Sequence, residues 1–550
     1  MGKRNHDRVL VHHHELNERI SLGFIKHQNL GQCHKDMKMM FDELVRKEIK
    51  VEKLEDKIAR LEKELSKAKQ TEEKPQFRKP KLESKQTPRD KKKKSKNNKG
   101  SRAKPKKPPS VKSKQVIVEC EPDNLPSGSK FHDYYDYKVQ DVEISLLETT
   151  YRIKRYICNG EIISGEVPEG VRGKFGAQLK SLILTLNNAL HGSEPRIHEF
   201  LTSLGVSISQ GSISHILTGE SESFCEEMDR VLSVGIKASE YIQTDDTGAF
   251  HNGENYICTV VGNEFFSAFK TTKNKSRIEF LSTLQGENKE FLIDAKAVSY
   301  AEAHGVSGEK LDKLLLKERR FTEREDLERY LYNRLIESAH DVRVITEGAL
   351  ISGITERYDK ELLIVSDEAG QFNVFSRGLC WVHAERHFKK MLGVDEKMDA
   401  EIENYRDKIW RYYELLKKYK KRPSKLTKLM LWELFDSLFK FETEYQDLAE
   451  AVSRFIKKKK QLLLVLDFPC LPLHNNLSEN HIRDFVVRRK VSPTTRSIKG
   501  RKARDALLGI KKTCKKIGLN FFEFIHDRVS RQFLIPPLDL LVAQKIAANA

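Results

Sequence analysis

The segment from Lys74 to Lys114 most constrains how this chain can fold. It holds 18 basic and 2 acidic residues, and so supplies +16 of the net charge of +19 carried by 550 residues. Because it has several prolines and almost no apolar side chains, it cannot bury a core. We therefore expect a linker between a helical start and a globular remainder. Its charge suits a polyanionic partner, although a solvated spacer would have the same composition.

Apolar residues recur at heptad spacing ahead of this linker. One heptad position holds Leu30, Met37, Leu44, Val51, Ile58 and Leu65, and its partner position holds Met40, Leu54 and Leu61. The repeat predicts a coiled coil over residues 1–70 that pairs two copies of the chain. A lone amphipathic helix packed on its own domain would show the same repeat. We favour pairing because the basic linker, residues 71–114, comes directly after it.

Cysteine use and apolar runs indicate where the protein works. Eight cysteines are spread over the chain without dense regular spacing, which argues against a secreted disulfide scaffold. Apolar runs such as LLLVL at 462–466 fall far short of the roughly 20 residues that a membrane helix needs. With no signal pattern at the N-terminus, we expect a soluble, intracellular protein without a membrane partner.

Ordered sequence resumes near Gln115. The stretches QVIVEC and TTYRIKRYIC are rich in β-branched and aromatic residues, and they predict two strands in a small β-rich region, residues 115–175. Each stretch ends in a cysteine, Cys120 and Cys158. Two isolated cysteines do not provide four ligands, so we predict no structural zinc there.

Two packed helices are predicted within residues 176–235. The apolar stripe consists of Ile197, Phe200, Leu201 and Leu204, then Ile208, Ile213 and Ile216, with Gly205 at the break. This spacing suits a helix-turn-helix whose second helix begins near Ser209. That helix would present to DNA the side chains of Gln210, Ser212, Ser214 and His215. Any pair of antiparallel helices shares the apolar pattern, so DNA reading stays open at this point.

Short strands and turns begin at Tyr241. EYIQTDDTG, NYICTVVGN and FFSAFKTT stand at hairpin distance and predict three antiparallel strands before a helix at 276–284. ELLIVSDEAGQFN and GLCWVHAERHFKKM then predict strands that alternate with helices. The expected fold class is α/β, with a mixed sheet over residues 236–389 that is completed by residues 466–550. Helical spacing of apolar residues predicts a helical insertion at 390–465.

Two of these strands end in aspartate, at Asp245 and Asp367. A strand end can hold an ion-binding carboxylate rigidly, although for either aspartate alone a turn or helix cap is the simpler interpretation. In LPLHNNLSENHIRD, Glu479 by itself suits a capping box with Asn476. Together the three acids would hold two divalent cations about 3.5 to 4 Å apart. Hard oxygen ligands favour Mg²⁺ or Mn²⁺.

These stretches resemble a known family. TDDTG, SDEAGQFN, GLCWVHAERHF, and NNLSENHIRDFVVRRK followed by TTRSIKGRKA are similar to motifs of the transposases of insertion sequence sixty-six. These are bacterial DDE enzymes with a ribonuclease-H-like core. The resemblance covers the chain from about residue 115 to its end. It implies a ribonuclease-H-like mixed sheet with a helical insertion, preceded by a coiled coil, a basic linker and a helix-turn-helix.

The resemblance also implies which residues do the chemistry. The catalytic and metal-binding acids would be Asp245, Asp367 and Glu479, with two Mg²⁺ or Mn²⁺ ions. Asp246 remains a substitute for Asp245, because only one of two successive strand residues faces the site. Cys380 and His383 match a C-W-x-H element, which we interpret as a packed strand end beside the site rather than half of a zinc site.

Two departures from the family pattern stand out. The family carries paired cysteines before the helix-turn-helix, whereas here only Cys120 and Cys158 remain. Region 115–175 therefore resembles a zinc-binding domain that has lost its ligands. Asn480 replaces the arginine that usually follows the third acid, while Arg483 keeps the later one.

The implied function is a DNA transposase that binds the ends of an insertion sequence and catalyses two-metal-ion cleavage and strand transfer. Basic residues expected to hold the DNA are Arg483, Arg488, Arg489, Lys490, Arg496, Lys499, Arg501 and Lys502. Expected partners are double-stranded DNA, as element ends and as target, and a second copy of the chain. The expected location is the bacterial cytoplasm, at the nucleoid. Two alternatives stay open: an inactive or repurposed transposase acting as a DNA-binding repressor, and a ribonuclease-H-like nuclease.

Overall fold

The fold is described from a computed structural model of the chain. The described residues are 117–120, 127–139, 141–142, 144–159, 161–168, 171, 173–219, 221–314, 318–440 and 442–549. The chain divides into two compact units, 1–135 and 136–550, and the labelled helices and strands belong to the second unit. The coiled coil expected at 1–70 and the linker expected at 71–114 lie outside the described residues.

The region expected to be β-rich contains one hairpin. Strand β1 (Arg155–Cys158) pairs antiparallel with β2 (Glu161–Ser164), and every residue of both strands is exposed. The strand expected at 115–120 is not formed over its described part, residues 117–120 of the first unit. Ile117 and Val118 there are 89% and 74% exposed. β-Branched side chains favour a strand only where they can pack on a neighbour.

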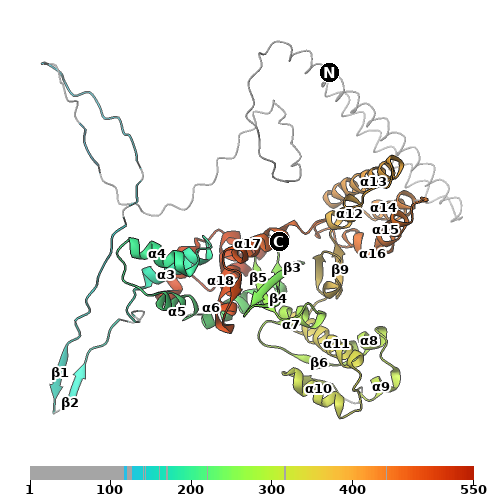
Figure 1. Ribbon diagram of the computed structural model, residues 1–550, viewed down its shortest axis with the longest axis horizontal. Coiled ribbons are helices and arrows are strands. Elements are labelled where there is room, and N and C mark those ends of the chain that lie inside the picture. Colours follow the sequence, from blue (N-terminus) through green and yellow to red (C-terminus); the bar gives the residue numbers. More distant parts are fainter. Residues whose placement is uncertain are drawn as a thin grey trace. The chain divides into compact units, whose positions relative to one another are not determined.

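Three helices come after the hairpin and pack on one another, as Figure 1 shows. They are α3 (Ala177–Asn188), α4 (Glu194–Ser203) and α5 (Gln210–Gly219). Ile197, Leu201 and Ile213 are buried between them, as the apolar stripe predicted. Gly205 adopts a left-handed φ of +87° in the turn between α4 and α5, a conformation that glycine adopts at no steric cost. Helix α6 (Ser221–Ala238) leads on to the sheet.

A mixed sheet lies at the centre of the second unit, in the order β5-β4-β3-β8-β9. Its strands are β3 (Ile242–His251), β4 (Glu254–Gly262), β5 (Ser267–Thr272), β8 (Leu363–Ser366) and β9 (Ser376–Leu379). The first three are antiparallel, while β8 and β9 run parallel to β3. Asn252 and Gly253 both have positive φ in the β3–β4 turn, as the favoured two-residue hairpin turn requires. The expected mixed α/β architecture is confirmed.

A small subdomain that we did not expect joins β5 to β8. After helix α7 (Arg277–Gln285) the chain forms an antiparallel pair, β6 (Phe291–Ile293) with β7 (Arg319–Phe321). Its helices are α8 (Ala295–Ala303), α9 (Gly308–Asp312), α10 (Arg324–Tyr332) and α11 (Ala339–Tyr358). Helix α11 packs on α7 and α8 and returns the chain to β8, where a short turn, η1 (Gly370–Phe372), precedes β9.

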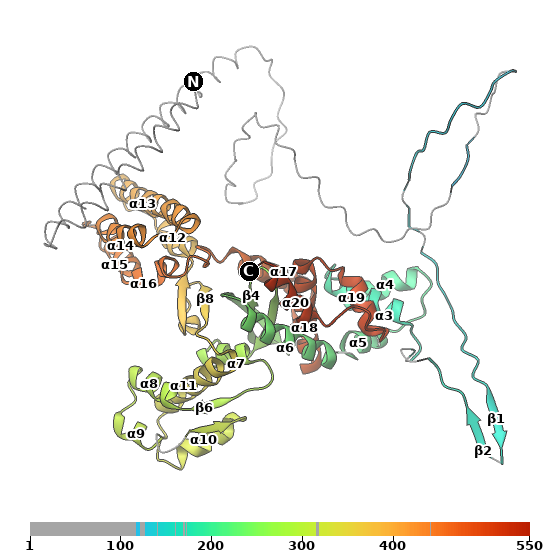
Figure 2. The ribbon, with the colours of Figure 1, turned by 180° about the vertical axis from the view of Figure 1, so that it is seen from behind.

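The interval in which we expected a helical insertion contains helices with their own core. Helix α12 (Trp381–Lys389) comes just before this interval and shares its core. The segments that follow are α13 (Glu396–Lys421), α14 (Lys425–Phe439), α15 (Gln446–Lys457), α16 (Lys459–Leu462) and η2 (Leu464–Leu466). Figure 2 shows them grouped beside β8. The buried indole of Trp381 stacks on Tyr412, with ring centroids 5.4 Å apart, and meets Phe435 and Phe455 edge-on.

The last helices cover the sheet. Helix α17 (Asn476–Val491) packs on β3 and β4, and α18 (Ile498–Ile517) packs on β5 and α6. The short strand β10 (Thr494–Thr495) pairs with the end of β3. Helices α19 (Phe521–Val529) and α20 (Leu538–Ala547) pack on α3 and α6 respectively. None of the helices among the described residues is long and apolar enough to cross a membrane.

Candidate active site

The first two acids lie side by side at the ends of neighbouring strands. Strands β3 and β8 are paired in parallel up to Gln243 and Val365. Asp245 and Asp367 each stand two residues later, so the shared register brings both to the same edge of the sheet. One oxygen of each carboxylate accepts a local backbone hydrogen bond: Asp245 from Asp246 N at 2.8 Å, and Asp367 from Ala369 N at 3.0 Å. Within the described residues, no hydrogen bond is found to the other oxygen of either carboxylate.

The strand register separates Asp245 from Asp246. Asp245 is paired across the sheet with Val260, which packs with Ile482 and Phe485 of α17 in a small core. Successive strand residues face opposite sides, so Asp245 faces α17 and Asp246 faces away from it. Consistent with this, the Asp246 carboxylate accepts from Lys275 Nζ at 2.9 Å and from Gln371 Nε2. The structure thereby favours Asp245 as the acid on the side of the third carboxylate.

Asn475 ties the start of α17 to both strand ends. Its side-chain amide donates to the carbonyl of Thr244, one residue before Asp245, at 2.8 Å. Its backbone N–H donates to Cys380 Sγ at 3.2 Å. Cys380 in turn donates its own backbone N–H to Ser366, one residue before Asp367, at 3.0 Å. We call Thr244, Ser366, Cys380 and Asn475 the bracket, because these four residues fix three chain segments that carry the three acids.

Glu479 stands in the first turn of α17 and is held by helix α12. Its Oε1 lies 3.3 Å from His383 Nε2 and 3.4 Å from Arg386 Nη2. The capping box suggested by the sequence is wrong: Asn475, not Asn476, occupies the cap position, and its side chain makes no capping hydrogen bond. Its amide is committed to Thr244 instead, so Glu479 does not serve as the partner of a cap.

Asp245 is a half-buried carboxyl whose neighbours include other acids. Burial, together with the charges of Asp367, Asp246 and Glu479, raises the pKa of Asp245 to about 7. Desolvation and nearby like charges both disfavour an ionised carboxylate. A carboxyl perturbed in this way beside other acids is a typical functional-site signature.

The donor chemistry fits a hard divalent cation. The three acids offer only carboxylate oxygens, which Mg²⁺ and Mn²⁺ prefer, and a bound cation would relieve the repulsion that raises the pKa of Asp245. The three acids lie near one another, but their side chains are not arranged as a set of metal ligands. Over the part of the chain that the structure describes, no group of three or more His, Cys, Asp or Glu side chains could hold a metal ion.

Comparisons with known proteins identify the family to which the chain belongs. The family model described as Transposase IS66 family matches residues 365–503, an interval that carries Asp367, Cys380, Asn475 and Glu479. An uncharacterized protein y4jO of Sinorhizobium fredii (strain NBRC 101917 / NGR234) is 38% identical over 320 residues, which are 57% of this chain and all of that protein. This chain belongs to the IS66 family of transposases. No solved structure matches it.

The structure explains why the motifs of this IS66-family chain take the form they do. The cysteine of GLCWVH and the first asparagine of HNN are both members of the bracket. The histidine of the first motif, His383, contacts the third acid. The glutamine of SDEAGQFN, Gln371, binds Asp246. From the sequence we did not identify Arg386, Lys275 or Gln371 as site residues. Gln371 and Arg386 could have been found, because they lie inside the motifs SDEAGQFN and GLCWVHAERHF, whereas Lys275 lies in no such motif.

The side chains expected to read DNA from α5 lie partly at the surface. Gln210 and His215 are exposed, while Ser212 and Ser214 are half-buried. The Ser209 hydroxyl accepts from Ser212 N at 3.1 Å and so caps α5 near the predicted start. Helix α5 of this IS66-family chain therefore has Gln210 and His215 exposed at its surface.

Basic residues of α17 and α18 divide into two sets. Arg488 donates to the carbonyl and side-chain oxygens of Asn187, and Arg489 donates to the carbonyl of Gly248. Both guanidinium groups are thus occupied within the chain, and we remove them from the proposed DNA-contacting set. The residues that remain at the surface are Arg483, Lys490, Arg496, Lys499 and Lys502. Two of these also have acidic neighbours: Arg483 lies 3.9 Å from Glu479, and Lys502 donates to Glu287 at 3.2 Å. Arg501 is half-buried, with its guanidinium 5.1 Å from the centroid of the Tyr256 ring.

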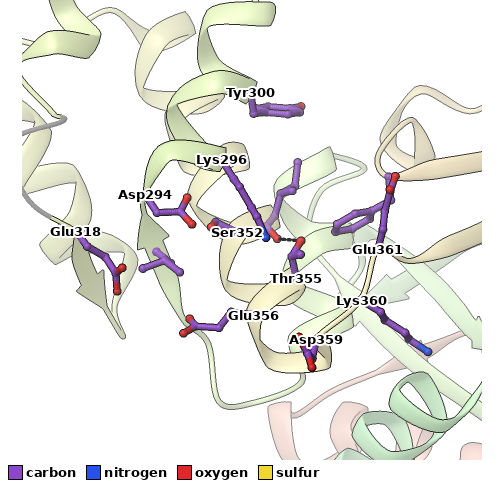
Figure 3. Close-up of a pocket in the computed structure, with 13 residues that line it drawn as sticks. Asp294, Lys296, Tyr300, Glu318, Ser352, Thr355, Glu356, Asp359, Lys360 and Glu361 are labelled. Carbon is purple, nitrogen blue, oxygen red and sulfur yellow. Dashed lines mark hydrogen bonds between the residues drawn. The ribbon is translucent and has the colours of Figure 1, made fainter.

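A cavity of about 800 Å³ lies elsewhere, lined by residues of β6, α8 and α11 (Figure 3). None of the three acids lines it. Of its own acids, Glu356 binds Arg320 and Asp294 caps α8 by accepting from Ala297 N at 2.9 Å. These carboxylates have structural partners, so we place the candidate active site at the strand ends and not in this cavity.

Proposed function

We propose that this protein is a DNA transposase that cleaves the ends of a mobile element and joins them to target DNA. The observation that carries the proposal is the bracket, which draws the segments bearing Asp245, Asp367 and Glu479 to one edge of the sheet. The strand order, with three antiparallel strands followed by two parallel ones, supports a ribonuclease-H-like core. Membership of the IS66 transposase family supports the same function.

The three acids would hold two Mg²⁺ or Mn²⁺ ions. When bound, such ions lower the pKa of a water or a 3′-hydroxyl and stabilise the leaving oxygen of a phosphodiester. Asp245 and Asp367 supply their carboxylates from rigid strand ends, and Glu479 supplies its own from the first turn of α17. His383 and Arg386 hold Glu479 beside that edge. Exposed Arg483 and Lys490 on the same helix would bind DNA phosphates next to the acids.

The natural partner is double-stranded DNA. Helix α5 would read the element ends through Gln210 and His215, and the basic surface residues of α17 and α18 would hold the backbone. A second copy of the chain, paired through the heptad repeat, would bring two ends together.

The test is cleavage of DNA by the full chain. Duplexes covering the sequence immediately outside each end of the coding region are incubated with protein and Mg²⁺. We expect specific cleavage that is lost, by at least about 10³-fold, in Glu479→Gln. Exposed Glu433 on α14 provides the matched control, Glu433→Gln, which should cleave like the parent. Equal cleavage by the parent and Glu479→Gln would overturn the assignment.

A second pair of variants distinguishes the neighbouring aspartates. Asp245→Asn should lose cleavage to the same extent as Glu479→Gln. Asp246→Asn should retain most of it, because Asp246 is already engaged by Lys275 and Gln371 on the opposite face. The reverse order would make Asp246 the ligand.

One observation favours a non-catalytic alternative, a DNA-binding protein that represses. Glu479 is held by His383 and Arg386, and the acids form no ready metal group within the described residues. Under this alternative the parent protein binds the end duplexes tightly and never cleaves them with Mg²⁺ or Mn²⁺. Cleavage by the parent would exclude it.

A further inference from the structure

Helix α17 is bound at its middle to the helices proposed to read DNA. Asp484 lies one and a half turns beyond Glu479, and its carboxylate accepts from His191 Nε2 at 2.9 Å. His191 belongs to the loop between α3 and α4. Lys511 and Lys512 of α18 approach the same carboxylate at 2.8 and 3.0 Å. Asp484 is therefore the meeting point of the catalytic helix, α18 and the α3–α4 loop.

Arg488, one turn further along α17, makes a second connection to the same place. Its guanidinium donates to both the carbonyl and the side-chain oxygen of Asn187, the penultimate residue of α3. Asn187 in turn donates to Gly192 O at 2.9 Å and so holds the α3–α4 loop. A two-pronged guanidinium contact of this kind fixes orientation as well as distance.

The α3–α4 loop makes these contacts in a strained backbone conformation. His191 adopts a φ of +56°, in the left-handed region that residues other than glycine rarely occupy. Such strain persists only where surrounding contacts impose it, and it concentrates at functional sites. Lys511 also donates to Asn188 O, at 2.9 Å. The polar contacts are thus concentrated on the end of α3 and the loop that follows it, although α3 also packs on the sheet's helices through apolar residues.

A helix is stiff along its axis, so a displacement of one part also displaces the rest. Glu479, Asp484 and Arg488 lie on one continuous helix, with Asp484 about 7.5 Å and Arg488 about 13.5 Å from Glu479 along the axis at 1.5 Å per residue. The N-terminal end of α17 is fixed by the bracket, while its middle is fixed to the α3–α4 loop. A shift or rotation of that loop would therefore be felt at the first turn, where Glu479 stands.

We propose that Asp484 and Arg488 are positioning residues for Glu479, which make the placement of the third acid depend on the docked helices α3–α5. Element-end recognition through α5 would in this way be coupled to assembly of the active site. The inference rests on the proposed function, and it adds a regulatory link between two parts of the chain that the function uses separately.

The test compares Arg488→Met and Asn187→Ala, singly and together, with Val487→Ala as a matched control on the exposed face of α17. Three quantities are measured on the full chain: affinity for the end duplex, Mn²⁺ affinity without DNA, and cleavage rate at saturating DNA. We expect Arg488→Met to bind the duplex within about threefold of the parent, to bind Mn²⁺ more weakly, and to cleave about 10- to 100-fold more slowly. Val487→Ala should match the parent in all three.

The double variant separates a specific link from general damage. If Arg488 acts through Asn187, adding Arg488→Met to Asn187→Ala should cause a smaller loss than Arg488→Met causes in the parent, because only the bond to the carbonyl of residue 187 then remains to be lost. The inference is overturned if Arg488→Met keeps the parent's Mn²⁺ affinity and cleavage rate, or if its losses follow only its unfolded fraction measured by urea denaturation. A parent protein that cleaves no DNA at all would instead overturn the proposed function, and the inference with it.

Discussion

Asn475 shows how one buried amide can arrange a site that it does not enter. The residue is fully buried; it donates to Thr244 O and Cys380 Sγ, and its carbonyl accepts the Glu479 N–H at 3.1 Å as α17 begins. Its Oδ1 atom has no hydrogen-bond partner among the residues that the structure describes, although a buried amide oxygen normally has one. The position therefore selects asparagine for its donor and for its fit, since an aspartate would place a carboxylate against the Thr244 carbonyl.

Asn475→Ala should separate stability from activity. Loss of the hydrogen bond to Thr244 costs stability, but removal of the unpartnered oxygen offsets part of it, so we expect a loss of about 1 kcal/mol in the free energy of unfolding. Cleavage should fall by more than about tenfold, because α17 is no longer tied to β3 beside Asp245. Urea denaturation and end-duplex cleavage measure the two effects. Asn476→Ala, at an exposed neighbouring position, should change stability by less than about 0.5 kcal/mol.

Asp484 gives the protein a predictable response to acid. Burial alone would raise the pKa of this carboxyl, but hydrogen bonds from His191 and Lys511 and the charge of Lys512 hold the pKa well below its usual range. A depressed folded-state pKa contributes stability that is present above the unfolded-state pKa, about 3.9 for aspartate, and is lost as the pH falls below it. Asp484→Asn should therefore be less stable than the parent at pH 7, by about 3 kcal/mol.

The pH profile of that difference is the measurement. Urea midpoints of the parent and Asp484→Asn should stay apart by a constant amount from about pH 7 to about 4.5, and approach each other below about pH 4. A difference that widens as the pH falls would mean that the Asp484 pKa is not depressed.

At the scale of elements, the alternation of apolar and polar residues and the helical spacing of apolar residues predict the sheet, but they do not predict every element packed around it. The strands carrying Asp245 and Asp367 are predictable because apolar and β-branched residues fill them and turn residues come next. The subdomain at 286–358 is not, since its strands span three residues each and depend on pairing with each other. Short strands leave almost no periodic signal.

The directions of Arg488 and Arg489 can be obtained from the sequence, although we grouped both with the residues expected to hold the DNA. Seven residues, about two helical turns, separate Arg488 from His481 and Arg489 from Ile482. His481 and Ile482 are buried, so both arginines project from the buried side of α17. Grouping the basic residues by their position in the chain hides this, whereas assigning each to a helical face reveals it. The partner of Arg488, Asn187, lies 301 residues away, and no local pattern indicates such a contact.

Helix α5 carries a prediction of its own. A double variant, Gln210→Ala with His215→Ala, removes two exposed side chains and should leave the free energy of unfolding within about 0.5 kcal/mol of the parent. If α5 reads base edges, affinity for the end duplex should fall by roughly 10- to 100-fold while affinity for unrelated DNA is kept. Fluorescence anisotropy on both duplexes measures this. Thr202→Ala, exposed on α4, is the matched control, and an equal loss on both duplexes would show phosphate binding without reading.

At the scale of the whole molecule, most of the excess basic charge lies in a different part of the sequence from the elements proposed to read and cleave DNA. The excess of basic residues is concentrated between Lys74 and Lys114, while the rest of the sequence is nearly neutral. The described part of the chain holds a main core around the sheet and a second core within the helical insertion. Base reading is proposed for α5 and phosphate binding for the basic surface of α17 and α18, and the basic segment is expected to add a general attraction for DNA.

Salt dependence tests that division. Each phosphate contact adds about −0.9 to the slope of log affinity against log salt concentration. Replacing Lys91, Lys92, Lys93 and Lys94 by glutamine in the full chain should therefore make the slope for an unrelated duplex shallower by up to about 3.6. The ratio of end-duplex to unrelated-duplex affinity at a fixed salt concentration should stay the same, because α5 is unchanged. Arginine at the same four positions keeps the charge and should keep the parent's slope. An unchanged slope in the glutamine variant would identify the segment as a solvated spacer, and the attraction for DNA would then have to come from exposed residues such as Lys490, Arg496 and Lys499.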